Sequence, residues 1–179
     1  MLKHPMNDKQ QEIIQEQGLQ DLVEAFFQSP DNYIVPVGDD GTMENWLFDN
    51  MLFTLQNAKK LQQDIREEFG VELRLEHGFR HQESIARLKS QGYNPSPTSD
   101  HYKALGIDWH PFQKVLVNGL AQWQRIQDTK TLQMLGKWIF ANRTKYNIQQ
   151  LGVYNNKVFR GGFHTGFNKL RKLSYFERF

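Results

Sequence analysis

The stretch that decides the fold is Ser99-Asp100-His101-Tyr102-Lys103-Ala104-Leu105-Gly106-Ile107-Asp108. In it, a histidine that leaves a proline-containing loop is followed seven residues later by an aspartate on a short apolar segment. The residues between them include Ala104 and Gly106, whose small size allows two ligating groups to approach one point. Imidazole and carboxylate both suit Zn²⁺, so His101 and Asp108 form a predicted half-site for zinc.

The rest of the composition limits what could complete this site. The chain of 179 residues has no cysteine, so any metal must be held by histidine and carboxylate side chains. His164 is the best third ligand, because glycines at 161, 162 and 166 permit close backbone approach around it. The other histidines fit less well: His4 is near the N-terminus, His77 and His81 flank Arg80, and His110 follows a strand end.

Hydrophobic periodicity and turn residues predict helices and strands in an α+β order. Helices are expected at 8–28, 43–69, 82–90 and 131–142, with a further helix from Pro111 that carries Phe112, Val115, Leu116, Leu120 and Trp123. Strands are expected at 71–76, 105–109, 148–154, 157–160 and 162–167. We therefore expect a small antiparallel sheet that carries the zinc site and is flanked by helices. Residues 1–50 would form an N-terminal helical extension packed on a globular unit of residues 51–179.

The motif Ser-x-His-x-x-Gly-x-Ala-x-Asp is the signature of the zinc D-Ala-D-Ala carboxypeptidase superfamily, which includes murein endopeptidases and the Hedgehog signalling domain. Ser99, His101 and Asp108 match its spacing, while Ala104 and Gly106 occupy the small positions in exchanged order. Upstream, residues 69–71 and 75–83 resemble the family's Phe-Gly, strand and Ser-Gly-Tyr-Arg-Ser-Pro-Glu segment. Downstream, residues 152–154 and 162–166 resemble its glycine-rich hairpin. The resemblance covers roughly residues 55–167.

This resemblance implies a zinc-peptidase-like domain at 51–179 and a role for each matching residue. His101, Asp108 and His164 would hold Zn²⁺, and Arg80 would grip a substrate carboxylate or carbonyl. Asp100 would join Arg80 in catalysis, and Ser99 and His77 would join it in substrate binding. The expected activity is hydrolysis of peptide bonds in peptidoglycan stem peptides, by a D,D-carboxypeptidase or an endolysin-type endopeptidase.

One departure from the family pattern leaves a second function open. Many members carry a general base three residues before the last histidine, and Gly161 stands there in this chain. The base would have to come from elsewhere, with Glu76, His77, His81, Asp100 and His110 as candidates by proximity in sequence. Otherwise the chain would be an inactive, zinc-stabilised binding or virion-structural module, which could dock a partner through its N-terminal helices.

Charge and hydropathy set the remaining expectations. The net charge is +2, and the C-terminal region is basic, with Lys157, Arg160, Lys169, Arg171, Lys172 and Arg178 against the single acid Glu177. This region could face anionic cell wall or nucleic acid, or it could be a solvated surface; no recognisable motif predicts specific nucleic-acid binding. No signal peptide and no membrane span are expected. The expected location is cytoplasmic as synthesised, with release to the cell wall or carriage on a virion.

Overall fold

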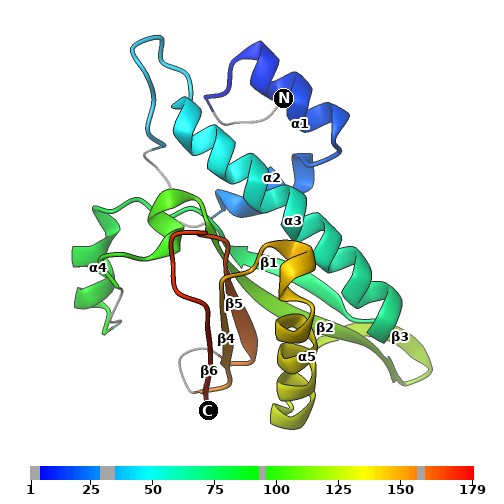
Figure 1. The fold of residues 1–179 in the computed structure, drawn as a ribbon. Coiled ribbons are helices and arrows are strands. Elements are labelled where there is room, and N and C mark those ends of the chain that lie inside the picture. Colours follow the sequence, from blue (N-terminus) through cyan, green and yellow to red (C-terminus); the bar gives the residue numbers. More distant parts are fainter. Residues whose placement is uncertain (1–4, 29–34, 93–95, 157–159) are drawn as a thin grey trace.

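The structure of the protein is a computed structural model that describes residues 5–28, 35–92, 96–156 and 160–179. Over these residues the fold is α+β, as predicted, with the N-terminal helices at one end, the sheet at the other and α3 running between them (Figure 1). The helices are α1 (Asp8–Glu16), α2 (Gln20–Phe26), α3 (Asn45–Phe69), α4 (Ser84–Ser90) and α5 (Thr129–Ala141), with the 3₁₀ helices η2 (Asp100–Lys103) and η3 (Arg143–Tyr146). The strands are β1 (Glu72–His77), β2 (Gly106–Val117), β3 (Leu120–Arg125), β4 (Gln150–Tyr154), β5 (Gly162–Gly166) and β6 (Ser174–Arg178).

The N-terminal segment holds two helices where the sequence predicted one over 8–28. The side chain of Asn7 caps α1 by accepting a hydrogen bond from the backbone N–H of Gln10, whose own side chain accepts from the N–H of Asn7. Gly18 has a φ of +58° and follows the end of α1. A left-handed residue stops an α-helix, so the chain turns there before α2 begins.

Helix α3 confirms the helix predicted over 43–69. Its buried residues follow one face, and Gly70 ends it in the left-handed conformation with a φ of 64°. The expected boundary between residues 50 and 51 falls inside this helix. Side chains from α1, α2 and α3 also belong to the same hydrophobic core as those of the sheet. Helix α3 therefore spans the expected boundary, and the N-terminal helices and the sheet pack into one hydrophobic core.

The six described strands form one sheet in the order β1-β2-β5-β4-β6, with β3 pairing only with β2. The pairs β1–β2, β2–β3, β2–β5 and β4–β5 are antiparallel, but β4 and β6 are parallel. The expectation of an antiparallel sheet is thus wrong at this edge, and the sheet is mixed. The difference arises because the chain after β5 crosses the Gln150 end of β4 and then reverses, so that β6, a strand that the sequence did not predict, runs antiparallel to β5 and parallel to β4.

The predicted helix from Pro111 is wrong, because residues 106–125 form a long β-hairpin. Strand β2 continues through Pro111 to Val117 and pairs with β3 across a turn at Asn118 and Gly119, whose φ angles are 52° and 79°. An Asn-Gly pair with positive φ at both residues is the favoured two-residue hairpin turn. The apolar residues of this segment fit a helical spacing by coincidence, and the turn decides between the two structures. The strand-like piece predicted at 157–160 lies largely outside the described residues.

Alternation along β2 and β5 separates the core from the opposite face of the sheet. Trp109 and Thr165 point into the core, where Trp109 Nε1 donates a hydrogen bond of 2.8 Å to Thr165 Oγ1. Asp108 and His164 are direct partners in the register of β2 and β5. Because neighbouring residues in a strand point to opposite faces, Asp108 and His164 lie together on the face away from Trp109.

Candidate metal centre

Three side chains from separate segments converge at the sheet. His101 comes from η2, Asp108 from β2 and His164 from β5, and each offers one ligand atom within 4.8 Å of the other two. His164 Nδ1 lies 2.9 Å from Asp108 Oδ1, and His101 Nε2 lies 3.3 Å from Asp108 Oδ2. All three residues are buried. The structure thus brings together the three predicted metal ligands.

The turn that carries His101 depends on the small residues of the motif. Ala104 ends η2 in the left-handed conformation, with a φ of 56°, and Leu105 N–H donates to Asp100 O at 2.9 Å. This turn lays η2 against the start of β2. A Cβ on Gly106 would lie 3.0 Å from the backbone nitrogen of His101, so a side chain there would press on the turn. Gly106 therefore lets His101 approach Asp108.

The ring of His101 is oriented by the loop after β1. Its Nδ1 lies 2.6 Å from the carbonyl oxygen of Gly78, a separation at which Nδ1–H donates to that oxygen. The proton on Nδ1 leaves Nε2, the nitrogen nearest Asp108, with a free lone pair. A Cβ on Gly78 would lie 2.2 Å from the Phe26 ring, so Gly78 is held by the packing of α2.

The protonation states of the group suit a cation. Burial lowers the pKa of His101 below its usual value, against the opposing effect of Asp108. Burial raises the pKa of Asp108, but the neighbouring His101 and His164 lower it well below its usual value. A carboxylate beside a neutral imidazole is the state that binds a metal. Four donors arranged tetrahedrally at about 2.1 Å from an ion lie roughly 3.4 Å apart, and the three ligand atoms here all lie within 4.8 Å of one another. The buried group could hold a metal ion.

The predicted substrate-binding residues surround this group in different ways. Arg80 is half-buried, its backbone N–H donates to the His101 carbonyl at 3.1 Å, and its charge contributes to lowering the pKa of His101. His77 is the register partner of Asp108 on β1, next to an irregularity in the strand pairing. Ser99 immediately precedes η2, and its carbonyl accepts from Tyr102 N–H. Arg80 and His77 thus lie beside the ligands, and Ser99 begins the turn that carries one of them.

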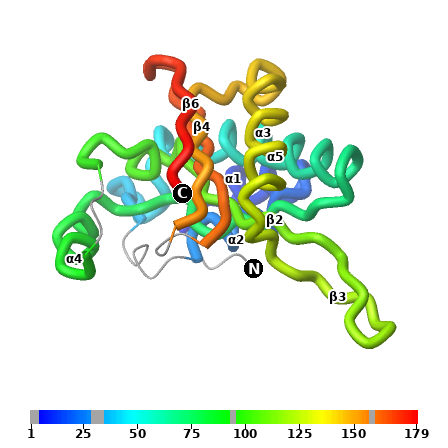
Figure 2. Tube along the Cα trace, turned by 90° about the horizontal axis from the view of Figure 1, so that it is seen from below, coloured from blue at the N-terminus to red at the C-terminus, as the bar shows by residue number. Residues whose placement is uncertain are grey.

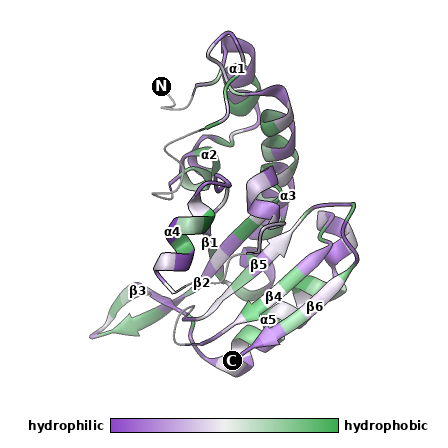
Figure 3. Cartoon of the chain, turned by 90° about the vertical axis from the view of Figure 1, so that its left-hand side faces the viewer, coloured by the Kyte–Doolittle hydropathy of each residue, from purple (hydrophilic) through white to green (hydrophobic). Residues whose placement is uncertain are grey.

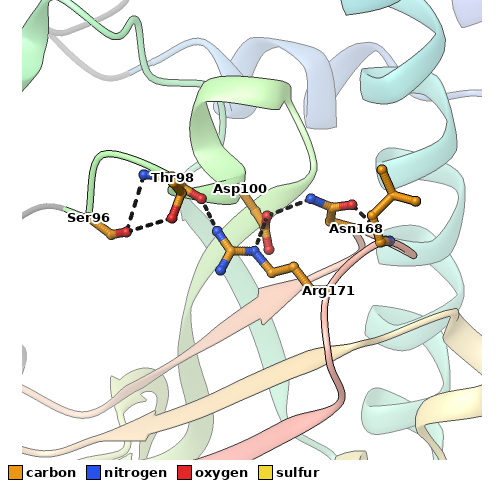
Figure 4. Close-up of polar contacts among 6 residues, drawn as sticks. Ser96, Thr98, Asp100, Asn168 and Arg171 are labelled. Atoms are coloured by element: carbon orange, nitrogen blue, oxygen red, sulfur yellow. Dashed lines mark hydrogen bonds and ion pairs between the residues drawn. The ribbon is translucent and has the colours of Figure 1, made fainter.

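Asp100, predicted to be catalytic, instead has its carboxylate engaged by the segment after β5. Its side chain is fully buried, and Oδ1 accepts from Arg171 Nε at 2.6 Å and from Asn168 Nδ2 at 3.2 Å. The same guanidinium donates through Nη2 to the carbonyl of Thr98 (Figure 4). These contacts tie the turn carrying His101 to the chain that leaves the strand carrying His164. They favour a positioning role for Asp100.

Gly161, where the sequence resemblance predicted a general base to be missing, has no room for a side chain. Its φ is +73°, and a Cβ would lie 2.5 Å from the carbonyl oxygen of Ile126. Its own carbonyl accepts from Arg125 through Nε at 3.2 Å and Nη2 at 2.8 Å. The backbone at this position is therefore fixed in a form that glycine alone adopts without strain.

The ligand-bearing face carries two further features: a contact between Glu76 and His110, two of the residues named as candidate bases from the sequence, and an aromatic pair that the sequence did not predict. Glu76 Oε2 lies 3.1 Å from His110 Nδ1, and His110 follows Asp108 by two residues on β2, so it shares the ligand's face. On the other side, the Tyr154 and Phe176 rings cover Gly152, the register partner of His164. Burial and the nearby Asp108 raise the pKa of Tyr154 to about 12. Period-2 alternation could have placed His110 once β2 was known to continue, but Phe176 depends on the unpredicted β6.

These features define a buried His-Asp-His group that could hold a metal ion, built where one turn meets two strands of an α+β fold. No protein-family model matches this chain, and neither a curated protein nor a solved structure matches it. Within residues 5–28, 35–92, 96–156 and 160–179, none of the helices is both long and apolar enough to cross a bilayer.

Proposed function

We propose that this protein is a zinc metallopeptidase that hydrolyses peptide bonds in peptidoglycan stem peptides. The observation that carries the proposal is the convergence of His101, Asp108 and His164, in the order and spacing of the zinc D-Ala-D-Ala carboxypeptidase superfamily. The family resemblance suggests the substrate class, and the chemistry of the three ligating side chains suggests the metal. Two imidazoles and one carboxylate, with no cysteine, suit Zn²⁺ in a catalytic site that keeps one position open.

A bound zinc ion would polarise the scissile carbonyl and lower the pKa of a coordinated water toward neutrality. Arg80 would hold the substrate through paired hydrogen bonds from its guanidinium to a carboxylate or carbonyl. The rings of Tyr154 and Phe176 would form an apolar wall on the opposite side, over Gly152. Substrate would lie between Arg80 and this wall, across the ligand-bearing face of the sheet.

We assign proton transfer to the Glu76–His110 pair, because Gly161 has no room for an acidic side chain. His110 lies on the ligand's face of β2, and Glu76 fixes its ring from β1. Hydrogen bonding to a carboxylate sets the orientation of an imidazole that accepts or delivers a proton. The expected result of Glu76→Gln is a loss of about 10²-fold or more in hydrolysis with zinc affinity retained.

The alternative is an inactive binding or virion-structural module in which zinc only stabilises the fold. The observation that favours it is the blocked position of Gly161. Under this alternative the chain binds zinc tightly, melts at a lower temperature after zinc removal, and leaves murein intact. Under the leading proposal it reaches its substrate after release from the cell or on a virion.

The deciding experiment combines zinc titration with hydrolysis of purified murein and of a short synthetic stem peptide. Wild type and His81→Ala should bind one zinc ion and release new amino termini, because His81 lies outside the ligand group. His164→Ala should lose both properties. Zinc binding without hydrolysis of either substrate would favour the inactive module, and absence of zinc binding in wild type would refute both functions.

A further inference from the structure

The hairpin of β2 and β3 extends beyond the body of the protein. Among the described strands, β3 pairs only with β2, and the hairpin reaches away from the helices (Figure 2). Its end is apolar, as the green colour of this region shows (Figure 3). Leu116 is 78% exposed, Val117 41% and Leu120 67%. Three large apolar side chains in water at the end of one projecting arm are an unusual concentration for a surface.

These side chains occupy both faces of the hairpin. Leu116 is opposite Ala121, and Val117 is opposite Leu120 in the strand register. Neighbouring residues in a strand point to opposite faces, so Leu116 and Val117 point in opposite directions. A flat protein surface would cover one face and leave the other in water. Only surroundings that enclose the tip bury both faces.

Behind the tip, on the face that carries Leu116, lies a cluster of aromatic and cationic side chains. Lys114 is the register partner of Trp123, and its Nζ lies 5.2 Å from the centre of the indole ring. The Arg74 guanidinium lies 4.1 Å from the Phe112 ring centre and 6.0 Å from that of Trp123. Lys114 precedes Leu116 by two residues, about 7 Å along a strand. This matches the depth of about 5–10 Å to which interfacial elements enter a bilayer, with Trp and Lys at the headgroup level.

The charge of the arm selects the type of lipid. Residues 112–125 contain two cationic side chains, Lys114 and Arg125, and no acidic one. Arg74 adds a third cation, which is paired with Glu72 at 2.6 Å. Cations next to an inserted apolar segment strengthen binding to anionic headgroups.

We propose that the β2–β3 hairpin anchors the protein to a membrane by inserting Leu116, Val117 and Leu120 into the surface of an anionic bilayer. This inference does not depend on the proposed peptidase activity. Asp108 and Leu116 are eight residues apart on β2. The arm would therefore hold the metal group about 26 Å from the inserted tip, outside the bilayer.

The test is sedimentation of the full chain with vesicles of phosphatidylcholine alone or mixed equally with phosphatidylglycerol. Wild type should bind the mixed vesicles, and the double variant Leu116→Ser/Leu120→Ser should partition at least about tenfold less. Leu170→Ser is the matched control: Leu170 is 92% exposed but lies outside the hairpin, so its loss should not change binding. Lys114→Ala should weaken binding to mixed vesicles more than to phosphatidylcholine alone. All variants should keep the wild-type circular dichroism spectrum and Tm, which report an intact fold.

A second readout places the tip in the lipid. Lipids brominated on the acyl chains should quench wild-type fluorescence more than that of Trp123→Phe. The inference is overturned if wild type does not sediment with mixed vesicles, or if the double variant binds as wild type does. It is equally overturned if the double mutation instead converts a dimer to a monomer in lipid-free buffer, or abolishes binding to murein while vesicle binding persists.

Discussion

At the scale of single residues, the glycines around the metal centre matter as much as the ligands, because a side chain at these positions would collide with neighbouring residues. A Cβ on Gly78 would meet the Phe26 ring, one on Gly106 the backbone of His101, and one on Gly166 would lie 2.6 Å from Asp100 Oδ2. Each of these glycines lies against a residue that carries or supports a ligand. Substitutions at them should therefore disturb the site as well as the stability of the fold.

Gly161→Asp, which introduces an acidic residue where the superfamily that the sequence resembles has its general base, should destabilise the protein. The cost should be about 2–4 kcal/mol, from the left-handed backbone and from the clash with the Ile126 carbonyl. Gly41→Ala separates the two causes, because Gly41 has a φ of +75° and nothing within 4 Å of a Cβ. It should lose only about 1–2 kcal/mol in urea denaturation. Equal losses for Gly161→Ala and Gly41→Ala would show that the clash is absent.

The apo-protein should become less stable as the solution is acidified. Burial lowers the pKa of folded His101 below its usual 6.5, so below that pH the unfolded chain binds more protons than the folded one. Asp108, whose folded pKa lies well below 3.8, adds a second loss of the same sign at lower pH. The free energy of unfolding, measured by urea denaturation from about pH 8 to about pH 4, should fall from near pH 6.5 downward. Zinc affinity should fall over the same range, and a stability that rises on acidification would contradict this assignment.

At the scale of elements, the segment that follows β5 ties together two of the ligand-bearing parts of the chain. Phe167 N–H donates to the carbonyl of Leu105, just before β2. Asn168 and Arg171 then bind the Asp100 carboxylate at the start of η2. The chain leaving the strand of His164 thus fixes the turn of His101.

Arg171→Ala should loosen η2 and weaken zinc binding. It leaves a buried carboxylate without its cation, which costs up to about 3–5 kcal/mol in stability. Zinc affinity, measured by calorimetry on the folded variant, should fall about tenfold because one ligand is no longer held in place. Arg171→Lys should recover part of both losses, because it restores the charge but not the two hydrogen bonds that the guanidinium donates to Asp100 and Thr98. The exposed neighbour Lys172→Ala is the control, and an unchanged zinc affinity in Arg171→Ala would exclude the positioning role.

At the scale of the whole molecule, the N-terminal helices reach the metal centre through packing. Phe26 of α2 is fully buried, its ring lies over Gly78, and its carbonyl accepts from the N–H of Phe79. Gly78 in turn accepts the hydrogen bond from His101 Nδ1. A docking role for the N-terminal helices stays a prediction, but these contacts already make them a support for the site.

Phe26→Ala should therefore lower both stability and zinc affinity. Removal of this ring should cost about 3–5 kcal/mol and free the Gly78 carbonyl that orients His101, with about a tenfold loss in zinc affinity. Leu132→Ala in α5 is the control, since Leu132 is equally buried but is not part of the chain of contacts from α2 to His101. It should lower the Tm with zinc affinity preserved. A parallel loss of affinity in both variants would show that affinity follows global stability.

The sequence by itself determined the α+β class, most helices and the identity of the three residues that could hold a metal. These features depend on local sequence. A helix repeats its apolar residues every three or four positions, and the spacing from His101 to Asp108 can be recognised without the rest of the chain. The hairpin at 106–125 also has a local signal, the Asn118-Gly119 turn, which the helical spacing of its apolar residues obscured. The tertiary structure alone decided the parallel pairing of β6 with β4 and the contacts of Asp100 and Gly161. Strand pairing and the space around a Cβ depend on residues that are distant in sequence. Neither composition nor periodicity shows which of these residues come into contact.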